Sequence, residues 1–280
     1  MKQEINRPGI GELDQDSVDL LEESAFSAHP QFASTLAHGL TVLKCFVGGA
    51  STLGNKDIAE RTGLTRPTVS RLTFTLMGFG FLRRDRKTNQ YALGPGVLSL
   101  GYPVLSQLAL RHVAASEMLE LAQFARGPIS VGTRDRLQVV YVETVQGRDT
   151  NSTKPDIGST RPMLRTAIGR ALMYAHHPED RKILSSRLKT AQPEEWEQFS
   201  SKLESAFAEI DSMGFCTVIA DWRPNLAAVA VPVLAPVNGL TLALNLTVPA
   251  YATDRAQLEK SLGPRLVSLV RNAEYKLGLV

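Results

Sequence analysis

The stretch "TGLTRPTVSRLTFTL", residues 62–76, joins a tight turn to a short helix with one polar face. Gly63 stands where a preceding short helix, with Asn55 as its predicted N-cap, would end. Thr65 is placed to cap the next helix, because its hydroxyl can accept a hydrogen bond from a free N–H of the first turn. Pro67 then falls in that first turn, where a missing N–H costs nothing.

The helix after this turn has two unlike faces. Apolar residues at helical spacing predict its buried face, which carries Val69, Leu72, Leu76 and Phe79. The opposite face carries Pro67, Ser70, Arg71 and Phe74. A helix, a short turn containing Gly and a second, polar-faced helix are typical of the helix-turn-helix motif.

A short basic hairpin is predicted directly after this motif, in "GFLRRDRKTNQYALG", residues 80–94. An apolar and basic strand leads into a polar turn at 85–89, and a second strand passes through Tyr91 and Leu93. The tip and stem carry four basic residues, Arg83, Arg84, Arg86 and Lys87. A hairpin in this position makes a winged helix-turn-helix. Its second helix would enter the major groove, and its wing would contact the DNA backbone or a minor groove.

The charge distribution agrees with this interpretation. Residues 1–31 hold two basic and seven acidic residues, whereas residues 32–94 hold nine basic and three acidic residues, a net charge of +6. The rest of the chain is nearly balanced, and the whole chain carries +3. A basic segment beside an acidic tail is expected of a nucleic-acid-binding module.

Specific side chains follow from the motif. Arg66 and Arg71 can reach phosphates or guanine edges, and short side chains suit close approach to phosphate. The expected DNA-binding residues are Thr65, Arg66, Pro67, Thr68, Ser70, Arg71, Phe74, Arg84, Arg86 and Lys87. The role of Phe74 stays open between a thymine methyl contact and a neighbouring loop. The alternative for the whole segment is a small basic domain that binds protein.

We expect four segments along the chain. Residues 1–31 read as a mostly disordered acidic tail, 32–94 as the winged domain, and 95–110 as a linker helix broken near Pro103. Residues 111–280 mix strands and helices without regular alternation, which indicates an α+β domain. The first helix of the winged domain, predicted over 34–47, has apolar residues at helical spacing: Leu36, Leu40, Leu43 and Val47.

In the second domain, "PISVGTRD" and "LQVVYVETV" lie close enough in sequence to pair as a hairpin. Three further strands are predicted in "FCTVIA", "LAAVAVPV" and "LTLALNLTV". The chain closes with a helix in which Asp254 and Gln257 have the spacing of a capping box.

The start "MKQEINRPGIGELD" lacks the apolar core of a signal peptide. The most apolar run, residues 226–248, is interrupted by Pro232, Pro236, Asn238 and Gly239, which favours two strands and a turn over a membrane helix. We therefore expect a soluble, cytoplasmic protein without a membrane partner. Two cysteines, Cys45 and Cys216, lie in apolar stretches and are expected to be buried reduced thiols rather than a disulfide.

Signatures of catalysis are lacking in the sequence. His176 and His177 precede Glu179 and Asp180, but adjacent side chains on a helix point about 100° apart and rarely hold one ion. We interpret this pair as a solvated helix end before Pro178. The sequence predicts no catalytic residue, no metal site and no cofactor, and therefore no enzyme.

A family resemblance joins these observations. "LGNKDIAERTGLTRPTVSRL" and "YALGPGVLSLG" closely resemble the N-terminal half of the isocitrate-lyase-regulator (IclR) family of bacterial transcription factors. "VVYVE", "TAIGRALM", "EIDSMGF", "LAAVAVPV" and "LALNLTVP" resemble its second half in the same order, so that the resemblance runs from about residue 32 to the C-terminus. It implies a winged N-terminal domain, a linker helix and a GAF-like α/β effector domain. It also implies dimers or tetramers on operator DNA.

The resemblance also implies an effector site at the start of the helix in "RTAIGRA". Carried over residue by residue, it gives main-chain donors at Ala167 and Ile168, with Val218, Asp221, Ala228, Asn245 and Thr247 on the facing strands and loop. Family members that bind small acids tend to have Asp where Val218 stands, so this site is more apolar. Arg165 can supply a positive charge instead. We infer a small carboxylated effector with an apolar or aromatic body.

The expected function is therefore a ligand-responsive regulator that binds near-palindromic, double-stranded operator DNA as a homo-oligomer. Two other classes stay open. One is a small-molecule-binding module whose winged domain contacts protein, and the other is an enzyme that acts through the second domain.

Overall fold

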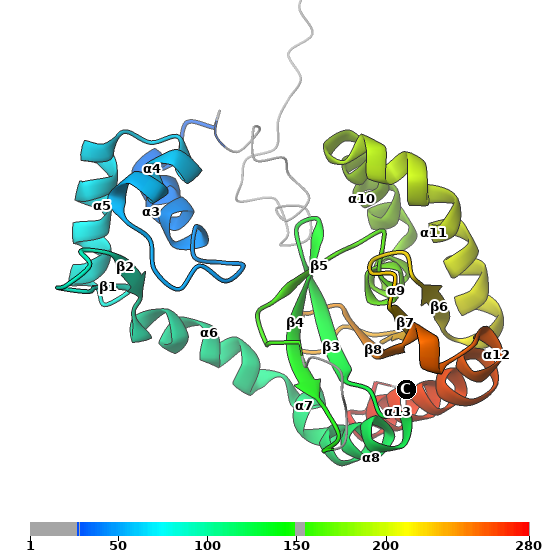
Figure 1. The fold of residues 1–280 in the computed structure, drawn as a ribbon. Coiled ribbons are helices and arrows are strands. Elements are labelled where there is room, and N and C mark those ends of the chain that lie inside the picture. The colour runs from blue at the N-terminus through cyan, green and yellow to red at the C-terminus, as the bar shows by residue number, and fades with distance from the viewer. Residues whose placement is uncertain (1–26, 28, 149–154, 280) are drawn as a thin grey trace, which may run out of the picture. The chain divides into compact units, whose positions relative to one another are not determined.

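The computed structural model describes residues 27, 29–148 and 155–279, so most of the predicted acidic tail lies outside the described residues. Contacts divide the chain into two compact units, residues 1–107 and residues 108–280. Figure 1 shows the elements of each unit.

The N-terminal unit packs short helices against a hairpin. Its elements are α3 (Ser34–Lys44), α4 (Asn55–Thr62), α5 (Arg66–Gly78), β1 (Leu82–Arg84), β2 (Tyr91–Leu93) and α6 (Pro95–Gln107). Strands β1 and β2 pair antiparallel, and Leu53 bridges to Tyr91 beside them. One apolar core joins the helices to the hairpin through Val42, Phe46, Leu53, Ile58, Val69, Leu72, Leu82 and Tyr91. The predicted helix-turn-helix followed by a hairpin is confirmed.

Of the predicted apolar stripe of α3, only Leu43 packs against this core. Leu36, Leu40 and Val47 are 64%, 51% and 59% exposed, whereas Val42 is fully buried. A Cβ atom on Gly39 would lie 4.0 Å from the Leu72 side chain. The side of α3 that lacks a side chain at Gly39 therefore approaches α5 closely, and Leu36 and Leu40 turn outward.

The ends of α4 and α5 follow local chemistry. Gly54, not Asn55, is the N-cap of α4, and its N–H donates to Asp57 Oδ2 at 2.8 Å. The prediction of Asn55 as the cap is therefore wrong by one residue. Gly63 ends α4 with a φ of 70°, a left-handed conformation that glycine adopts without strain. Thr65 caps α5 as predicted.

Helix α6 runs through Pro103 without a break and ends at Gln107, so the predicted break near Pro103 is wrong. Proline removes one backbone hydrogen bond, but the hydrogen bonds on either side hold the helix together. No residue of α6 is buried. Four of its large apolar side chains are more than half exposed, those of Leu98, Leu100, Tyr102 and Val104.

The C-terminal unit is built on an antiparallel sheet whose order is β5-β4-β3-β8-β7-β6. Its strands are β3 (Ile129–Asp135), β4 (Gln138–Val145), β5 (Thr160–Pro162), β6 (Cys216–Ile219), β7 (Leu226–Pro232) and β8 (Leu242–Pro249). Strands β3 and β4 form the predicted hairpin, with a register shift between Val131 and Gly132. The expected α+β class is confirmed.

Helices cover both sides of this sheet (Figure 1). Helices α8 (Ala115–Ala125) and α13 (Gly263–Lys276) lie on one side, and α7 (Ala109–Val113) packs beside them. On the other side lie α9 (Ala167–Ala175), α10 (Pro178–Ala191) and α11 (Pro193–Met213). The Cys216 thiol on β6 contacts the carbonyl oxygen of Ala167 at 3.5 Å, which fixes the α9 side of the sheet.

The closing helix is less regular than predicted. After a short 3-10 helix, Ala250–Ala252, Asp254 caps α12 (Arg255–Gln257) by accepting a hydrogen bond from the Gln257 N–H at 2.7 Å. The Gln257 side chain accepts from Thr253 Oγ1 instead of completing a capping box. A π-helical stretch, Leu258–Leu262, then leads into α13. Gly263 begins α13 against Phe215, where a Cβ atom would lie 2.4 Å from the ring.

The apolar run 226–248 forms β7, a tight turn and β8, as predicted. Val237 and Leu240 exchange two backbone hydrogen bonds of 3.0 Å. Asn238 and Gly239 between them have φ values of 51° and 77°, as a tight hairpin turn requires. Among the described residues, no helix is long and apolar enough to cross a membrane.

Both cysteines are free, and they lie in different units. Cys216 is buried as predicted, whereas Cys45 is only half-buried. Burial raises the pKa of the Cys216 thiol to about 12. Burial also raises the pKa of Cys45, and the nearby Arg61 guanidinium opposes this rise.

Candidate DNA-binding and effector sites

Helix α5 presents a polar face to solvent. Val69, Leu72 and Thr73 are buried against the core. The exposed face carries Arg66, Pro67, Ser70, Arg71 and Phe74. These faces match the predicted ones except at Phe79. That residue is the C-cap of α5, is 73% exposed and stacks on Phe81 with ring centroids 6.4 Å apart, because the helix ends before it can turn inward.

Thr65 and Thr68 are joined at the start of α5. The Thr65 hydroxyl accepts a hydrogen bond from the Thr68 N–H at 3.4 Å, and the two hydroxyl groups lie 2.9 Å apart. The cap therefore fixes the first turn, from which Arg66 projects. Both hydroxyl groups thus take part in hydrogen bonds that hold the start of the helix.

The hairpin turn is held by one carboxylate. Asp85 Oδ1 accepts hydrogen bonds from the N–H groups of Lys87 and Thr88 at 2.7 and 2.9 Å. These backbone hydrogen bonds lower the pKa of Asp85, and the one from Thr88 has the larger effect. The turn leaves Arg86 and Lys87 exposed at its tip. The Arg84 guanidinium lies over the Tyr91 ring, 5.8 Å from its centroid.

Phe74 is the most unusual residue of the α5 surface. Its side chain is 74% exposed. It lines a shallow groove together with Ser70, Arg71 and Thr75. The Phe74 side chain therefore lies on the solvent-exposed face of α5 and not in the core.

In the C-terminal unit, the start of α9 is fixed by Thr166. Its hydroxyl accepts from the Gly169 N–H at 3.1 Å and donates to the Pro162 carbonyl oxygen at 2.7 Å. Helix geometry leaves the N–H groups of Ala167 and Ile168 without a partner inside the helix. Both residues are buried. The helix start thus offers main-chain donors and the positive end of the helix dipole.

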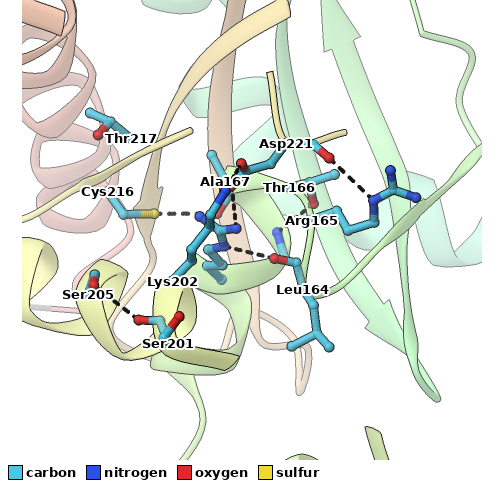
Figure 2. A network of polar contacts seen from close by, with 12 residues as sticks. Leu164, Arg165, Thr166, Ala167, Ser201, Lys202, Ser205, Cys216, Thr217 and Asp221 are labelled. Carbon is cyan, nitrogen blue, oxygen red and sulfur yellow. Dashed lines mark hydrogen bonds and ion pairs between the residues drawn. The ribbon is translucent and has the colours of Figure 1, made fainter. Parts of the chain in front are cut away.

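Asp221 is bound by basic side chains rather than left free. Arg170 Nη2 lies 2.6 Å from Asp221 Oδ2, and Arg170 Nε donates to the Leu164 carbonyl oxygen at 2.8 Å. Lys202 contacts the other carboxylate oxygen. Arg165 Nε donates to the main-chain oxygen of Asp221 at 3.3 Å, as Figure 2 shows. Arg165 and Asp221, both predicted at the effector site, therefore hold each other at one end of α9.

The other predicted effector residues share the side of the sheet that faces α9. Val218, Ala228 and Thr247 form one cross-strand row. Asn245 lies in the next row, between Ala230 and Ser130. The structure therefore brings these predicted residues together opposite Ala167 and Ile168.

Sequence reasoning missed a cluster on this side of the sheet. The Arg161 guanidinium carbon lies 4.9 Å from the centroid of the Tyr141 ring and 4.8 Å from that of Trp222. Burial raises the pKa of the Tyr141 hydroxyl, whereas the Arg161 charge and the nearby polar groups of Asn245 and Arg161 oppose the rise. The three residues come from β4, β5 and the loop after β6, so no local sequence motif predicts the cluster.

Comparison with known proteins now decides the family. Residues 35–86 match the IclR helix-turn-helix domain, and residues 102–274 match the C-terminal domain of the bacterial transcriptional regulator IclR. The chain belongs to the IclR family. It is a transcriptional regulator with a helix-turn-helix DNA-binding domain and not an enzyme, as the sequence predicts.

Individual IclR-family proteins resemble it over nearly their whole length. The transcriptional regulator TsaQ1/TsaQ2 of Comamonas testosteroni is 29% identical over 92% of each chain, and the Pca regulon regulatory protein of Pseudomonas putida is 25% identical over 90% of this chain and 87% of its own. A crystal structure of an IclR family regulator from Brucella abortus has a TM-score of 0.80 and 37% identity, covering 92% of this chain and 98% of its own.

One solved relative carries a ligand. An IclR homologue from Microbacterium hydrocarbonoxydans, crystallised with 4-hydroxybenzoate, has a TM-score of 0.70 and 20% identity, covering 88% of this chain and all of its own. At this identity the likeness concerns the fold.

The sequence interpretation of His176 and His177 as a solvated helix end is only half right in this IclR-family chain. His177 is exposed, but His176 is 9% exposed. A ring nitrogen of His176 lies 2.7 Å from the Leu172 carbonyl oxygen, and the other accepts from Arg134 Nε at 2.9 Å. The pair therefore splits, with His176 packed under the end of α9. Within the described residues, no group of three or more His, Cys, Asp or Glu is placed to hold a metal ion.

Proposed function

We propose that this IclR-family protein is a ligand-responsive regulator that binds near-palindromic operator DNA as a dimer or tetramer in the cytoplasm. Residues 32–94 would bind DNA, 95–110 would link the two domains, and 111–280 would bind a small carboxylated effector. The observation that carries the DNA-binding part is the exposed, polar and basic face of α5, from Arg66 to Phe74, beside the basic hairpin.

The proposed DNA contacts divide by chemistry. Arg66 and Arg71 lie on the exposed face of α5, where an arginine can bind a guanine edge or a phosphate. Pro67, Ser70 and the Thr65–Thr68 pair lie at the helix start, where close approach to the backbone is possible. Arg84, Arg86 and Lys87 of the hairpin would contact phosphates.

Phe74 fits a contact with a thymine methyl group. Thymine methyls are the apolar groups that B-DNA presents in its major groove, and phenylalanine is among the side chains that contact them. The 74% exposure of Phe74 on the face that carries Ser70 and Arg71 supports this role.

Exposed apolar surface in the N-terminal unit supports a homo-oligomer. No residue of α6 is buried, although Leu98, Leu100, Tyr102 and Val104 are exposed apolar residues along it. Apolar side chains that the described part of the chain leaves exposed along one helix indicate an interaction surface. A second copy would cover it and would place two recognition helices one DNA turn apart, about 34–36 Å.

The C-terminal domain supports a carboxylated effector. The first N–H groups of α9 have no partner inside the helix and suit a carboxylate, and Val218 and Ala228 on the facing row are apolar. Asn245 and Thr247 add polar groups, while Arg165 and Asp221 close one end of the site. The Microbacterium relative with 4-hydroxybenzoate bound indicates that a protein of this fold can hold an aromatic acid, and we infer the same ligand class for this chain.

A mobility-shift titration separates this proposal from a module that contacts protein. The full chain is mixed with the DNA upstream of its own gene at two salt concentrations. Retarded DNA that is released as salt rises supports binding to phosphates. The absence of a shift at low salt, with folded protein, would favour the protein-contact alternative.

A further inference from the structure

Two buried polar atoms on the α9 side of the sheet have no hydrogen-bond partner among the described residues: Asn245 Oδ1 and Arg161 Nε. Asn245 is 4% exposed, and its amide nitrogen donates to Thr247 Oγ1 at 2.9 Å. Exchanging the amide oxygen and nitrogen would not help, because the nitrogen would then be the atom without a partner. Buried polar groups are nearly always paired, so this cluster lacks a partner that a ligand can supply.

The aromatic rings fix the direction from which Arg161 can be approached. Its guanidinium lies over Tyr141 and Trp222, at 4.9 and 4.8 Å from their centroids, and Nη1 donates to the Thr160 carbonyl oxygen at 2.7 Å. Nε belongs to the edge of the guanidinium that faces away from Nη1. An arginine edge of this kind binds a carboxylate through parallel hydrogen bonds.

The cluster is continuous with the start of α9. Tyr141 pairs across the sheet with Gly132, and a Cβ atom on Gly132 would lie 2.7 Å from Ile168 Cδ1. Arg161 and Asn245 both lie near enough to the Tyr141 hydroxyl to lower its pKa. One ligand at this place can therefore meet an arginine edge and an amide oxygen beside two aromatic rings.

Arg165 is a poorer candidate for the charge that holds an anion. Its Nε donates to the Asp221 carbonyl oxygen, and its guanidinium lies over the Phe199 ring at 5.5 Å. Asp221 itself is held by Arg170 and Lys202. This network also fixes Trp222, the next residue, against Arg161.

We propose that Arg161, and not Arg165, binds the effector carboxylate, and that the effector is a planar carboxylate with a hydroxyl group that donates to Asn245 Oδ1. The aromatic faces of Tyr141 and Trp222 would select a flat body. This inference rests on the proposed function and names the ligand class of its effector site.

Isothermal titration calorimetry on the full chain tests the ligand class. The probes are 4-hydroxybenzoate, cyclohexanecarboxylate, which is not planar, and 4-hydroxybenzyl alcohol, which has no carboxylate. We expect 4-hydroxybenzoate to bind at least about tenfold more tightly than either of the others, the equivalent of one charge-assisted contact. Equal affinities, or no binding of any probe to folded protein, would overturn the ligand class.

Variants test the residues. Arg161→Gln should weaken 4-hydroxybenzoate binding by at least about tenfold, and Arg161→Lys, which keeps the charge, should weaken it less. Arg181→Gln is the matched control, because Arg181 also lies over two rings, those of Tyr174 and Phe207, but on α10. An equal or larger loss in Arg165→Gln than in Arg161→Gln would overturn the assignment.

Asn245→Ala separates the hydroxyl contact from the carboxylate contact. It should weaken binding of 4-hydroxybenzoate but leave binding of benzoate nearly unchanged. A loss of the same size for both acids would overturn the role of Asn245. Operator binding without acid, measured on the same samples, reports on the proposed function separately. Wild-type protein that binds operator but no probe would overturn the ligand class alone.

Discussion

Arg170 Nη2 lies 2.6 Å from Asp221 Oδ2, with side chains that are only 3% and 10% exposed. This ion pair ties α9 to the segment that follows β6. Because Trp222 comes next in the chain, the pair also holds one wall of the Arg161 cluster. Asp221, which the family resemblance places at the effector site, is thus also tied to α9 by this ion pair.

Replacing Asp221 should therefore cost stability. Asp221→Ala would leave the buried Arg170 charge unpaired, which should lower the free energy of unfolding by about 3–5 kcal/mol. Urea unfolding followed by circular dichroism measures the difference. The control is Glu179→Ala, because Glu179 and its partner Lys182 are about 70% exposed. That variant should change stability by less than about 1 kcal/mol. A loss for Asp221→Ala no larger than for the control would contradict the structural role.

The cap of the recognition helix can be tested in the same way. Thr65→Ala removes the acceptor for the Thr68 N–H and should lower the free energy of unfolding by about 1 kcal/mol. Thr65→Ser keeps the acceptor and should stay within a few tenths of a kcal/mol of the wild type. Equal unfolding midpoints for Thr65→Ala and the wild type would argue against the cap.

The Arg71→Ala variant shows whether Arg71 contacts a phosphate or a base. If Arg71→Ala removes a phosphate contact, operator affinity should fall alike on all sequences, and the salt slope should fall by about one. If it removes a base contact, the cost should be about 1–3 kcal/mol and confined to one base pair. Fluorescence anisotropy on operator variants measures both. Lys189→Ala, an exposed charge on α10, is the control. Unchanged binding by Arg71→Ala would remove this residue from the interface.

Phe74 should be sensitive to single methyl groups. Operators with uracil in place of thymine should bind the wild type more weakly, by about 0.8 kcal/mol for each contacted methyl group. Phe74→Ala should bind both operators equally. A variant that still discriminates between the two operators would rule out the proposed contact.

The two cysteines should differ in reactivity. Thiolate is the reactive form, and a pKa of about 12 keeps the buried Cys216 protonated at neutral pH. Cys45 is half-buried and should react first with a thiol reagent in native protein. Mass spectrometry of labelled peptides should show Cys216 modified only after unfolding. Equal labelling rates in native protein would contradict its burial.

Sequence alone predicted the features that depend on neighbouring residues. Gly63 and Thr65 act within one turn of chain, so the turn and the cap could be found without a structure. The buried face of α3 could not be predicted in this way, because it depends on the contact between Gly39 of α3 and Leu72 of α5. The Arg161 cluster was missed for a similar reason. Tyr141 lies on β4 and Trp222 lies in the loop after β6, about eighty residues further along the chain, and only the folded domain brings both next to Arg161.

Footprinting of the full chain on the DNA upstream of its own gene, with and without 4-hydroxybenzoate, tests the central claim most directly. We predict a protected, near-palindromic site with half-sites one DNA turn apart, and a protein concentration for half-protection that shifts by about 5- to 150-fold with the acid. No protected site at low salt would contradict DNA binding by α5. A protected site that does not respond to the acid would contradict the proposed effector.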